Sequence, residues 1–131
     1  MTSWLIELCK HTEIDAHCQC LPMNHHICYF MKGISGLSCI TGTEHDQICC
    51  FLLGIIHDIQ LPLGHDNGQV IWAVWNILDF VYLARYPIHT THTLDQLEDA
   101  LTQFHSNVTI FIDLGICFHF NLPKLHFLSH Y

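Results

Sequence analysis

The chain has 131 residues, of which 50% are apolar and only 12% are charged. Four lysine and arginine residues stand against twelve acidic ones, and the formal net charge is -8. Because lysine and arginine supply most of the sequence-independent affinity of proteins for DNA, this balance argues against strong nucleic-acid binding. The length corresponds to about one domain, and we treat residues 1–131 as a single region.

The chain contains eight cysteines and thirteen histidines, both unusually many. A small secreted domain can use eight cysteines in four disulfides, but Met1 to Lys10 lacks a basic stretch followed by a long apolar run. No uninterrupted apolar stretch is longer than that from Ile48 to Leu53, which is too short to span a bilayer. We therefore expect an intracellular protein with reduced thiols, neither secreted nor membrane-bound.

The first expected element is a helix from Ser3 to about His17, with Ser3 as its N-cap. Its apolar residues recur at helical spacing: Trp4, Leu5, Leu8 and Cys9. Leu21-Pro22 ends this helix. The segment from residue 25 to 34 is apolar and aromatic, but Gly33 and Gly36 make it a poor helix.

A second helix is expected from Thr43 to Ile59, with Thr43 as its cap and the acidic Glu44 and Asp46 near the positive end of the helix dipole. The residues from 61 to 68 contain proline, glycine and an Asp-Asn-Gly sequence, which predicts a loop.

The strongest helix signal runs from about Gln69 to Tyr86, and Pro87 ends it. One apolar stripe is formed by Ile71, Val74, Trp75, Leu78, Val81 and Tyr82. Trp72 falls on the flank of this stripe, where it exposes apolar area. Trp75 lies nearer the stripe and is compatible with the core.

Thr93-Leu94-Asp95-Gln96 fits a capping box that starts another helix. The apolar face of that helix comprises Leu94, Leu97, Leu101 and Phe104. Val108 to Asp113 is β-branched and fits either a strand or a helix, and Gly115 ends it. A last helix is expected from Leu122 to Tyr131, with Pro123 in its first turn. The fold class predicted by these segments is mainly α, an irregular arrangement of about five helices.

Several blocks of this sequence, in order along the chain, resemble fungal Plavaka-type transposases, which belong to the DDE class. The blocks are Phe30-Met31-Lys32-Gly33-Ile34-Ser35-Gly36-Leu37, Thr41-Gly42-Thr43-Glu44-His45, Leu78-Asp79-Phe80-Val81-Tyr82-Leu83-Ala84, His89-Thr90 with Thr93-Leu94, Leu97-Glu98 with Phe104-His105, Leu114-Gly115, His119-Phe120-Asn121-Leu122-Pro123-Lys124-Leu125-His126, and His130-Tyr131. The resemblance covers nearly the whole chain from about Ile14 onward.

The resemblance implies a larger enzyme with an RNase H-like catalytic core, in which acidic residues bind divalent metal. This chain resembles the helical insertion or linker that precedes the last catalytic glutamate, so no complete RNase H-like sheet is expected. The catalytic aspartates would lie upstream of Met1 and the glutamate downstream of Tyr131. No catalytic residue is therefore assigned, and we expect a non-catalytic remnant that needs no cofactor and is nuclear if the parent role is retained.

The chain departs from the family in a chemically consistent direction. Cysteine or tryptophan stands where arginine is typical of the family: at Cys18, Cys20, Cys28, Cys39, Cys50, Trp72, Trp75 and Cys117. Deamination of methylated CpG converts CGN arginine codons into Cys, Trp, His or Gln codons. The pattern indicates a decayed, arginine-depleted copy of a transposable element. Its exposed apolar side chains predict self-association and poor solubility.

A zinc site is the main alternative, because His17, Cys18, Cys20, His25, His26 and Cys28 are thiolate and imidazole donors within twelve residues. The Cys-x-Cys spacing is tighter than zinc motifs prefer, so the favoured interpretation is cysteines that arose by decay beside family histidines. The two functional alternatives to a transposase remnant are therefore a small Cys/His-rich zinc module and a domesticated protein-interaction domain.

The remaining candidates favour structural roles. We expect one of Cys49 and Cys50 in the core and the other on the surface, since adjacent helical residues point about 100° apart. His126 and His130 have an i, i+4 spacing that can bind metal, but with His119 we interpret them as structural. No local signature supports Cys–His catalysis. Asp95, Glu98 and Asp99 are expected to form a solvated helix face.

Overall fold

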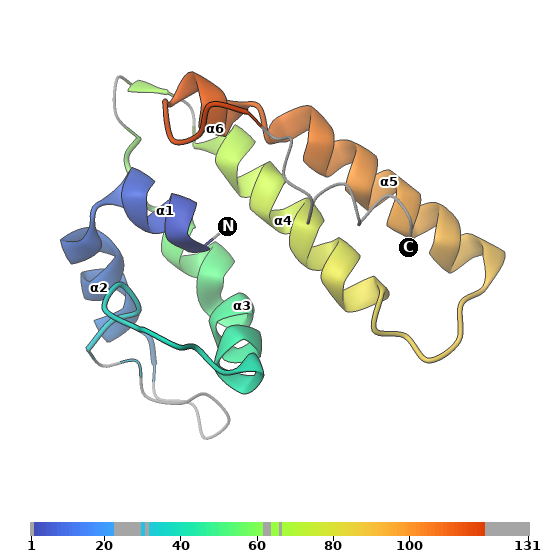
Figure 1. Ribbon diagram of the computed structural model, residues 1–131, viewed down its shortest axis with the longest axis horizontal. Helices are drawn as coiled ribbons and strands as arrows, with labels where there is room; N and C mark the ends of the chain where they lie inside the picture. The colour runs from blue at the N-terminus through green and yellow to red at the C-terminus, as the bar shows by residue number, and fades with distance from the viewer. Residues whose placement is uncertain (1, 23–29, 31, 62–63, 66, 120–131) are drawn as a thin grey trace. The chain divides into compact units, whose positions relative to one another are not determined.

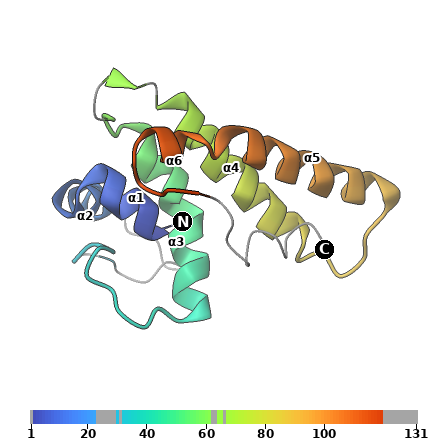
Figure 2. The same ribbon diagram turned by 45° about the horizontal axis from the view of Figure 1, so that its top comes forward.

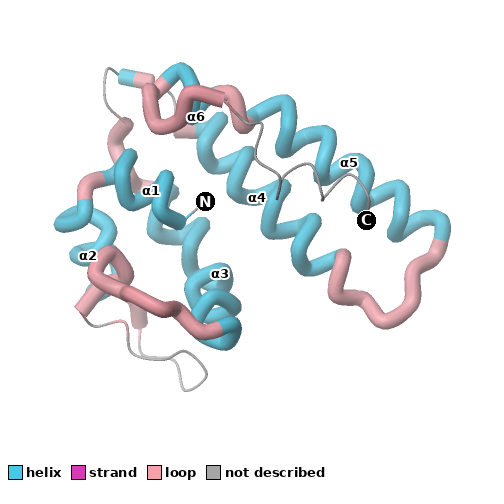
Figure 3. The backbone as a smooth tube through the Cα atoms, in the orientation of Figure 1, coloured by secondary structure: helices cyan, strands magenta, loops and turns pink. Residues whose placement is uncertain are grey.

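A computed structural model describes residues 2–22, 30, 32–61, 64–65 and 67–119. The described residues form six helices, α1 (Thr2–Cys9), α2 (His11–Gln19), α3 (Gly42–His57), α4 (Gly68–Leu83), α5 (Thr91–Asn107) and α6 (Ile110–Asp113), and contain no strand (Figure 3). The predicted mainly α class is confirmed. In this part of the chain no helix has the length and apolar character needed to cross a membrane.

The chain divides into two compact units, Met1–Asn67 and Gly68–Tyr131. The first unit holds α1, α2 and α3, and α2 packs against both of the others (Figure 1). Its fully or nearly fully buried side chains are Leu5, Leu8, Ile14, Cys18, Phe30, Ile34, Ile48, Phe51, Leu52, Ile55, Ile56, Ile59 and Leu61. The rings of Phe30 and Phe51 meet at a centroid distance of 5.5 Å, which ties the segment before Gly33 to α3.

The single helix predicted from Ser3 to His17 is wrong, because the backbone breaks at Lys10, whose φ is 60°. Leu5 and Ile14 are both 0% exposed. In one continuous helix, nine residues at roughly 100° each would put them on opposite faces. The break lets both side chains reach one core. The helix begins at Thr2, so Ser3 lies in its first turn and is not the N-cap.

The cap predicted for the next helix is also wrong: Thr41, not Thr43, is the N-cap of α3. The Oγ1 of Thr41 accepts a hydrogen bond from the backbone N–H of Glu44 at 3.3 Å, and the Glu44 carboxylate accepts one from the N–H of Thr41 at 2.8 Å. This reciprocal capping box starts the helix two residues earlier than predicted. The Glu44 carboxylate accepts hydrogen bonds from both the backbone N–H and the hydroxyl of Thr41, and these hold the pKa of Glu44 below its ordinary value.

In the second unit, α4 and α5 lie side by side as a helical hairpin in both views (Figures 1 and 2). Phe80 on α4 packs with Leu97 and Ala100 on α5, and Ile77, Leu83, Ala84 and Leu101 pack around them. Helix α4 ends at Leu83 rather than at Tyr86. The segment from Val108 to Asp113, which fitted either a strand or a helix, contains the short helix α6. This helix packs on α4 and buries Ile110 and Phe111.

The buried face of α4 differs from the predicted stripe. Val74 and Leu78 are buried as expected, but Trp75 is 49% exposed and Tyr82 is 38% exposed. The predicted stripe missed buried residues on the adjoining side of the helix: Val70, Ala73, Asn76 and Phe80. Trp72 is 59% exposed, which agrees with its predicted place on the flank.

Helix α5 is capped by Thr90, and Thr93 is its N3 partner rather than the cap predicted from the sequence. Thr93 Oγ1 accepts from the Thr90 N–H at 2.8 Å, and Thr90 Oγ1 accepts from the Thr93 N–H at 3.2 Å. Leu97 and Phe104 are buried as predicted, whereas Leu94 is 48% exposed. Gly115 has φ of 72° and ends α6, as predicted. The helix predicted from Leu122 to Tyr131 lies outside the described residues.

Candidate functional site

The most organised polar feature of the first unit joins Asp15 on α2 to the loop that follows Gly33. Asp15 Oδ1 accepts hydrogen bonds from the backbone N–H groups of Ile34 at 2.9 Å and of Ser35 at 3.0 Å. The hydroxyl of Ser35 donates to Asp15 Oδ2. Successive backbone N–H groups next to a residue of positive φ form an anion-binding nest, and here φ at Gly33 is 82°. The anion in this nest is the protein's own carboxylate.

The electrostatics of Asp15 follow from these contacts. Partial burial works to raise its pKa, but the hydrogen bonds from Ser35 and Ile34, together with the charge of His11, outweigh burial and hold the pKa below its ordinary value of 3.8. The carboxylate is therefore ionised near neutral pH. It fastens the loop to α2.

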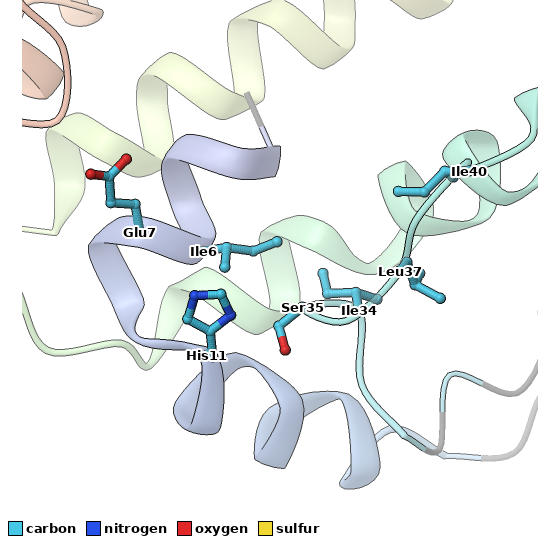
Figure 4. A pocket seen from close by; sticks show the side chains of 7 residues that line it. All are labelled: Ile6, Glu7, His11, Ile34, Ser35, Leu37 and Ile40. Atoms are coloured by element: carbon cyan, nitrogen blue, oxygen red, sulfur yellow. The ribbon is translucent and has the colours of Figure 1, made fainter.

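A hollow of about 440 Å³ lies beside this loop (Figure 4). It is lined by Ile6, Glu7, His11, Ile34, Ser35, Leu37 and Ile40. In Figure 4, Ile6 points toward the loop that carries Ile34 and Leu37, whereas Glu7 points away from it. A Ser–His nucleophile pair requires the serine proton to pass to histidine, but the Ser35 hydroxyl donates to Asp15. The lining is mostly aliphatic, and its polar groups are not arranged for nucleophilic catalysis.

The predicted zinc donors are only partly brought together. His17 and Cys20 line a second hollow, of about 390 Å³, together with Asp58. Within the described ranges, no three His, Cys, Asp or Glu side chains lie close enough to hold one metal ion. His17 Nδ1 donates to the carbonyl oxygen of Ile55 at 3.1 Å, which fastens the imidazole to α3.

Cys18 faces the core and is 5% exposed. Burial, and next the negative charge of Asp15, raise the pKa of its thiol to about 11. Because zinc binds the thiolate, this environment opposes a ligand role for Cys18. Cys20 is exposed. The other three predicted donors, His25, His26 and Cys28, lie outside the described residues.

The other sequence candidates are placed as follows. On α3, Cys50 is exposed, as predicted for the surface cysteine, whereas Cys49 is half-buried rather than in the core. Asp95, Glu98 and Asp99 are all exposed on α5, which confirms a solvated face. His119 is exposed, and His126 and His130 lie outside the described residues.

On α4 the exposure of Trp72 was predicted, but the exposure of Trp75 and its contact with Trp72 were not. Trp72 and Trp75 are both largely exposed, and their rings meet at a centroid distance of 6.3 Å with an interplanar angle of 47°. Trp75 Nε1 donates to Asp79 Oδ2 at 2.7 Å. The i, i+3 and i, i+4 spacing of these residues was a usable signal, but Trp75 was interpreted as a core residue instead.

No family model, no curated protein and no solved structure matches this chain.

Proposed function

We propose that this chain is a non-catalytic helical segment derived from a Plavaka-type DNA transposase, in which it would serve as scaffold beside a catalytic core located elsewhere in the parent enzyme. The observation that supports the proposal most is the role of the sequence blocks that resemble the family. In the part of the chain that the structure describes, residues of these blocks serve turns, helix caps and packing.

The first block supplies a loop. Gly33 adopts a positive φ, and Ile34 and Ser35 bind the Asp15 carboxylate. The second block supplies a helix start, because Thr41 and Glu44 form the capping box of α3. Both are local structural devices that help to place α2 and α3.

The later blocks supply the helical hairpin. Leu78 and Phe80 are buried on α4, and Leu97 and Phe104 are buried on α5. Thr90 and Thr93 cap α5. A segment whose family-like residues are used in this way supports a scaffold role better than a chemical one.

The experiment that tests this proposal incubates the 131-residue chain with Mg²⁺ or Mn²⁺ and a labelled DNA duplex. We expect neither cleavage nor strand transfer. Duplex binding should be weak, and with on the order of one or two phosphates neutralised it should fall only about three- to twelve-fold between roughly 50 and 200 mM salt. Metal-dependent cleavage that co-purifies with the chain, and is abolished by substituting one of its own carboxylates, would contradict the proposal.

The codons provide a second, independent test of the decayed origin. Every cysteine and tryptophan codon is one C-to-T transition from a CGN arginine codon, so the test compares copies of the element. Related copies in the same genome should carry CGN codons at the positions of Cys20, Cys50 and Trp72. Related copies that encode other residues there would show that the arginine-depleted copy is the wrong account of this composition.

A further inference from the structure

The exposed arc of α4 is almost entirely aromatic. Trp72, Trp75 and Tyr82 are 59%, 49% and 38% exposed, and Asp79 is exposed between them. Their spacing of three, four and three residues places these four side chains within an arc of roughly 80° on the helix. We call this set the aromatic stripe.

The chemistry of the aromatic stripe favours a cation. Indole and phenol rings carry negative potential on their faces, and the best cation partner of tryptophan in proteins is the arginine guanidinium. Asp79 adds a carboxylate within the stripe, held by the Trp75 Nε1 hydrogen bond of 2.7 Å. The stripe already shows this preference, because the Arg85 guanidinium carbon lies 5.7 Å from the centre of the Tyr82 ring.

The charge of the chain points the same way. Its net charge of -8 attracts basic partners and repels acidic ones. A second copy of the chain fits the stripe less well. Burying one stripe against another brings two Asp79 carboxylates into one apolar interface, and a buried charge without a partner of opposite sign is costly.

We propose that the aromatic stripe binds an arginine-rich peptide segment, whose guanidinium groups stack on Trp72 and Trp75 and pair with Asp79. Arginine suits this surface better than lysine, because the planar guanidinium stacks on rings while hydrogen-bonding a carboxylate, whereas the ammonium of lysine is a strongly hydrated point charge. This inference rests on the surface of α4 and is independent of the transposase origin.

The first test titrates the full chain into labelled octa-arginine and octa-lysine, with fluorescence anisotropy as the readout. We expect octa-arginine to bind roughly three- to ten-fold more tightly at the same ionic strength. Equal affinities would mean that net charge alone attracts both peptides, and this result would overturn the proposal. No binding of octa-arginine would overturn it as well.

Substitutions then locate the contact. The double variant Trp72→Leu with Trp75→Leu keeps apolar area but removes two rings, and should weaken octa-arginine binding roughly five- to thirty-fold. Asp79→Asn should weaken it roughly two- to five-fold, whereas Asp95→Asn, the same charge change on the exposed face of α5, should have a smaller effect.

Sedimentation velocity tests whether a second copy of the chain, rather than an arginine-rich peptide, covers the aromatic stripe. If a second copy covers the aromatic stripe, the wild-type chain should form a dimer that octa-arginine does not dissociate and that the leucine variant loses. That result would overturn the proposal. Dissociation of any self-association by octa-arginine, with no such effect of octa-lysine, would support it.

Discussion

The carboxylate of Asp15 occupies the space into which a side chain at residue 33 would project: a Cβ built on Gly33 would overlap the Asp15 carboxyl group. The same carboxylate binds the two backbone N–H groups that follow Gly33. Helix α2 and the loop after residue 32 therefore pack together through the Asp15 carboxylate, for which the absence of a side chain on Gly33 leaves room. This pair of residues explains why the block around Gly33 needs glycine at this position.

Gly33→Ala should therefore destabilise the chain. The left-handed φ of 82° alone costs a residue with a Cβ about 1–2 kcal/mol, and the overlap with Asp15 adds to that. Urea unfolding followed by circular dichroism measures the change. Gly36→Ala is the matched control, because a Cβ there meets nothing within 4 Å, and its stability should be nearly unchanged. Equal stability of both variants would contradict the described fit.

The Asp15 carboxylate predicts an acid-dependent stability. Its pKa is lower in the folded chain than its ordinary value of 3.8, so its contribution is present above that value and is lost as the pH falls through the folded pKa. Asp15→Asn should be less stable than wild type at pH 7 by about 1–3 kcal/mol, the usual worth of hydrogen bonds to a charged group. The difference between the two proteins should narrow below about pH 4. A difference independent of pH would show that the ionised carboxylate contributes nothing specific.

The capping box of α3 makes a prediction that separates two neighbouring threonines. Thr41→Ala should cost about 1 kcal/mol, because it removes the acceptor of the Glu44 N–H. Thr43→Ala should be nearly neutral, since Thr43 is exposed within the first turn and alanine is the better helix former. Thermal unfolding of both variants measures which substitution lowers the stability of the chain more. A larger loss for Thr43→Ala would instead favour the cap expected from the sequence.

These corrections show which features the sequence made predictable. The helical spacing of apolar residues in α3, α4 and α5 was sufficient to predict these helices, and Gly115 correctly marked the end of α6. The choice of Thr41 over Thr43 was predictable but was missed: both precede an apolar run, and only Thr41 has a glutamate, Glu44, three residues later at the spacing of a capping box. The break at Lys10 has no glycine or proline to mark it. It follows from the opposite faces of Leu5 and Ile14, a tertiary requirement that local propensity does not contain.

The candidate site was less predictable than the fold. Asp15 and Ser35 are twenty residues apart, and no local motif links them. Cys18 was a candidate metal ligand because several thiolate and imidazole donors lie near it in the sequence, but its side chain is buried in the core, as is that of Ile14. The aromatic stripe was not predicted, because bulky residues such as Trp75 and Tyr82 were assigned to the buried face of α4. The helix instead buries smaller residues such as Ala73 on the adjoining side.

The burial of Cys18 predicts selective thiol chemistry. A pKa of about 11 leaves the Cys18 thiol about 100-fold less ionised than a thiol at the ordinary value of 9.0. With iodoacetamide at pH 8, Cys20 and Cys50 should react fully before Cys18 does, as measured by mass spectrometry of tryptic and chymotryptic peptides. Labelling in denaturant is the control, and there the rates should converge. Rapid labelling of Cys18 in the native chain would mean that its place in the core is wrong.

The proposed origin of this chain, as a decayed and non-catalytic helical piece of a Plavaka-type transposase, is tested most directly by the flanking genomic DNA. Several kilobases on each side would be translated in all frames. The account predicts frame-broken remnants that carry the catalytic aspartates upstream of residue 1 and the catalytic glutamate downstream of residue 131. An intact and unrelated gene structure around the reading frame, with no such remnants on either side, would contradict it.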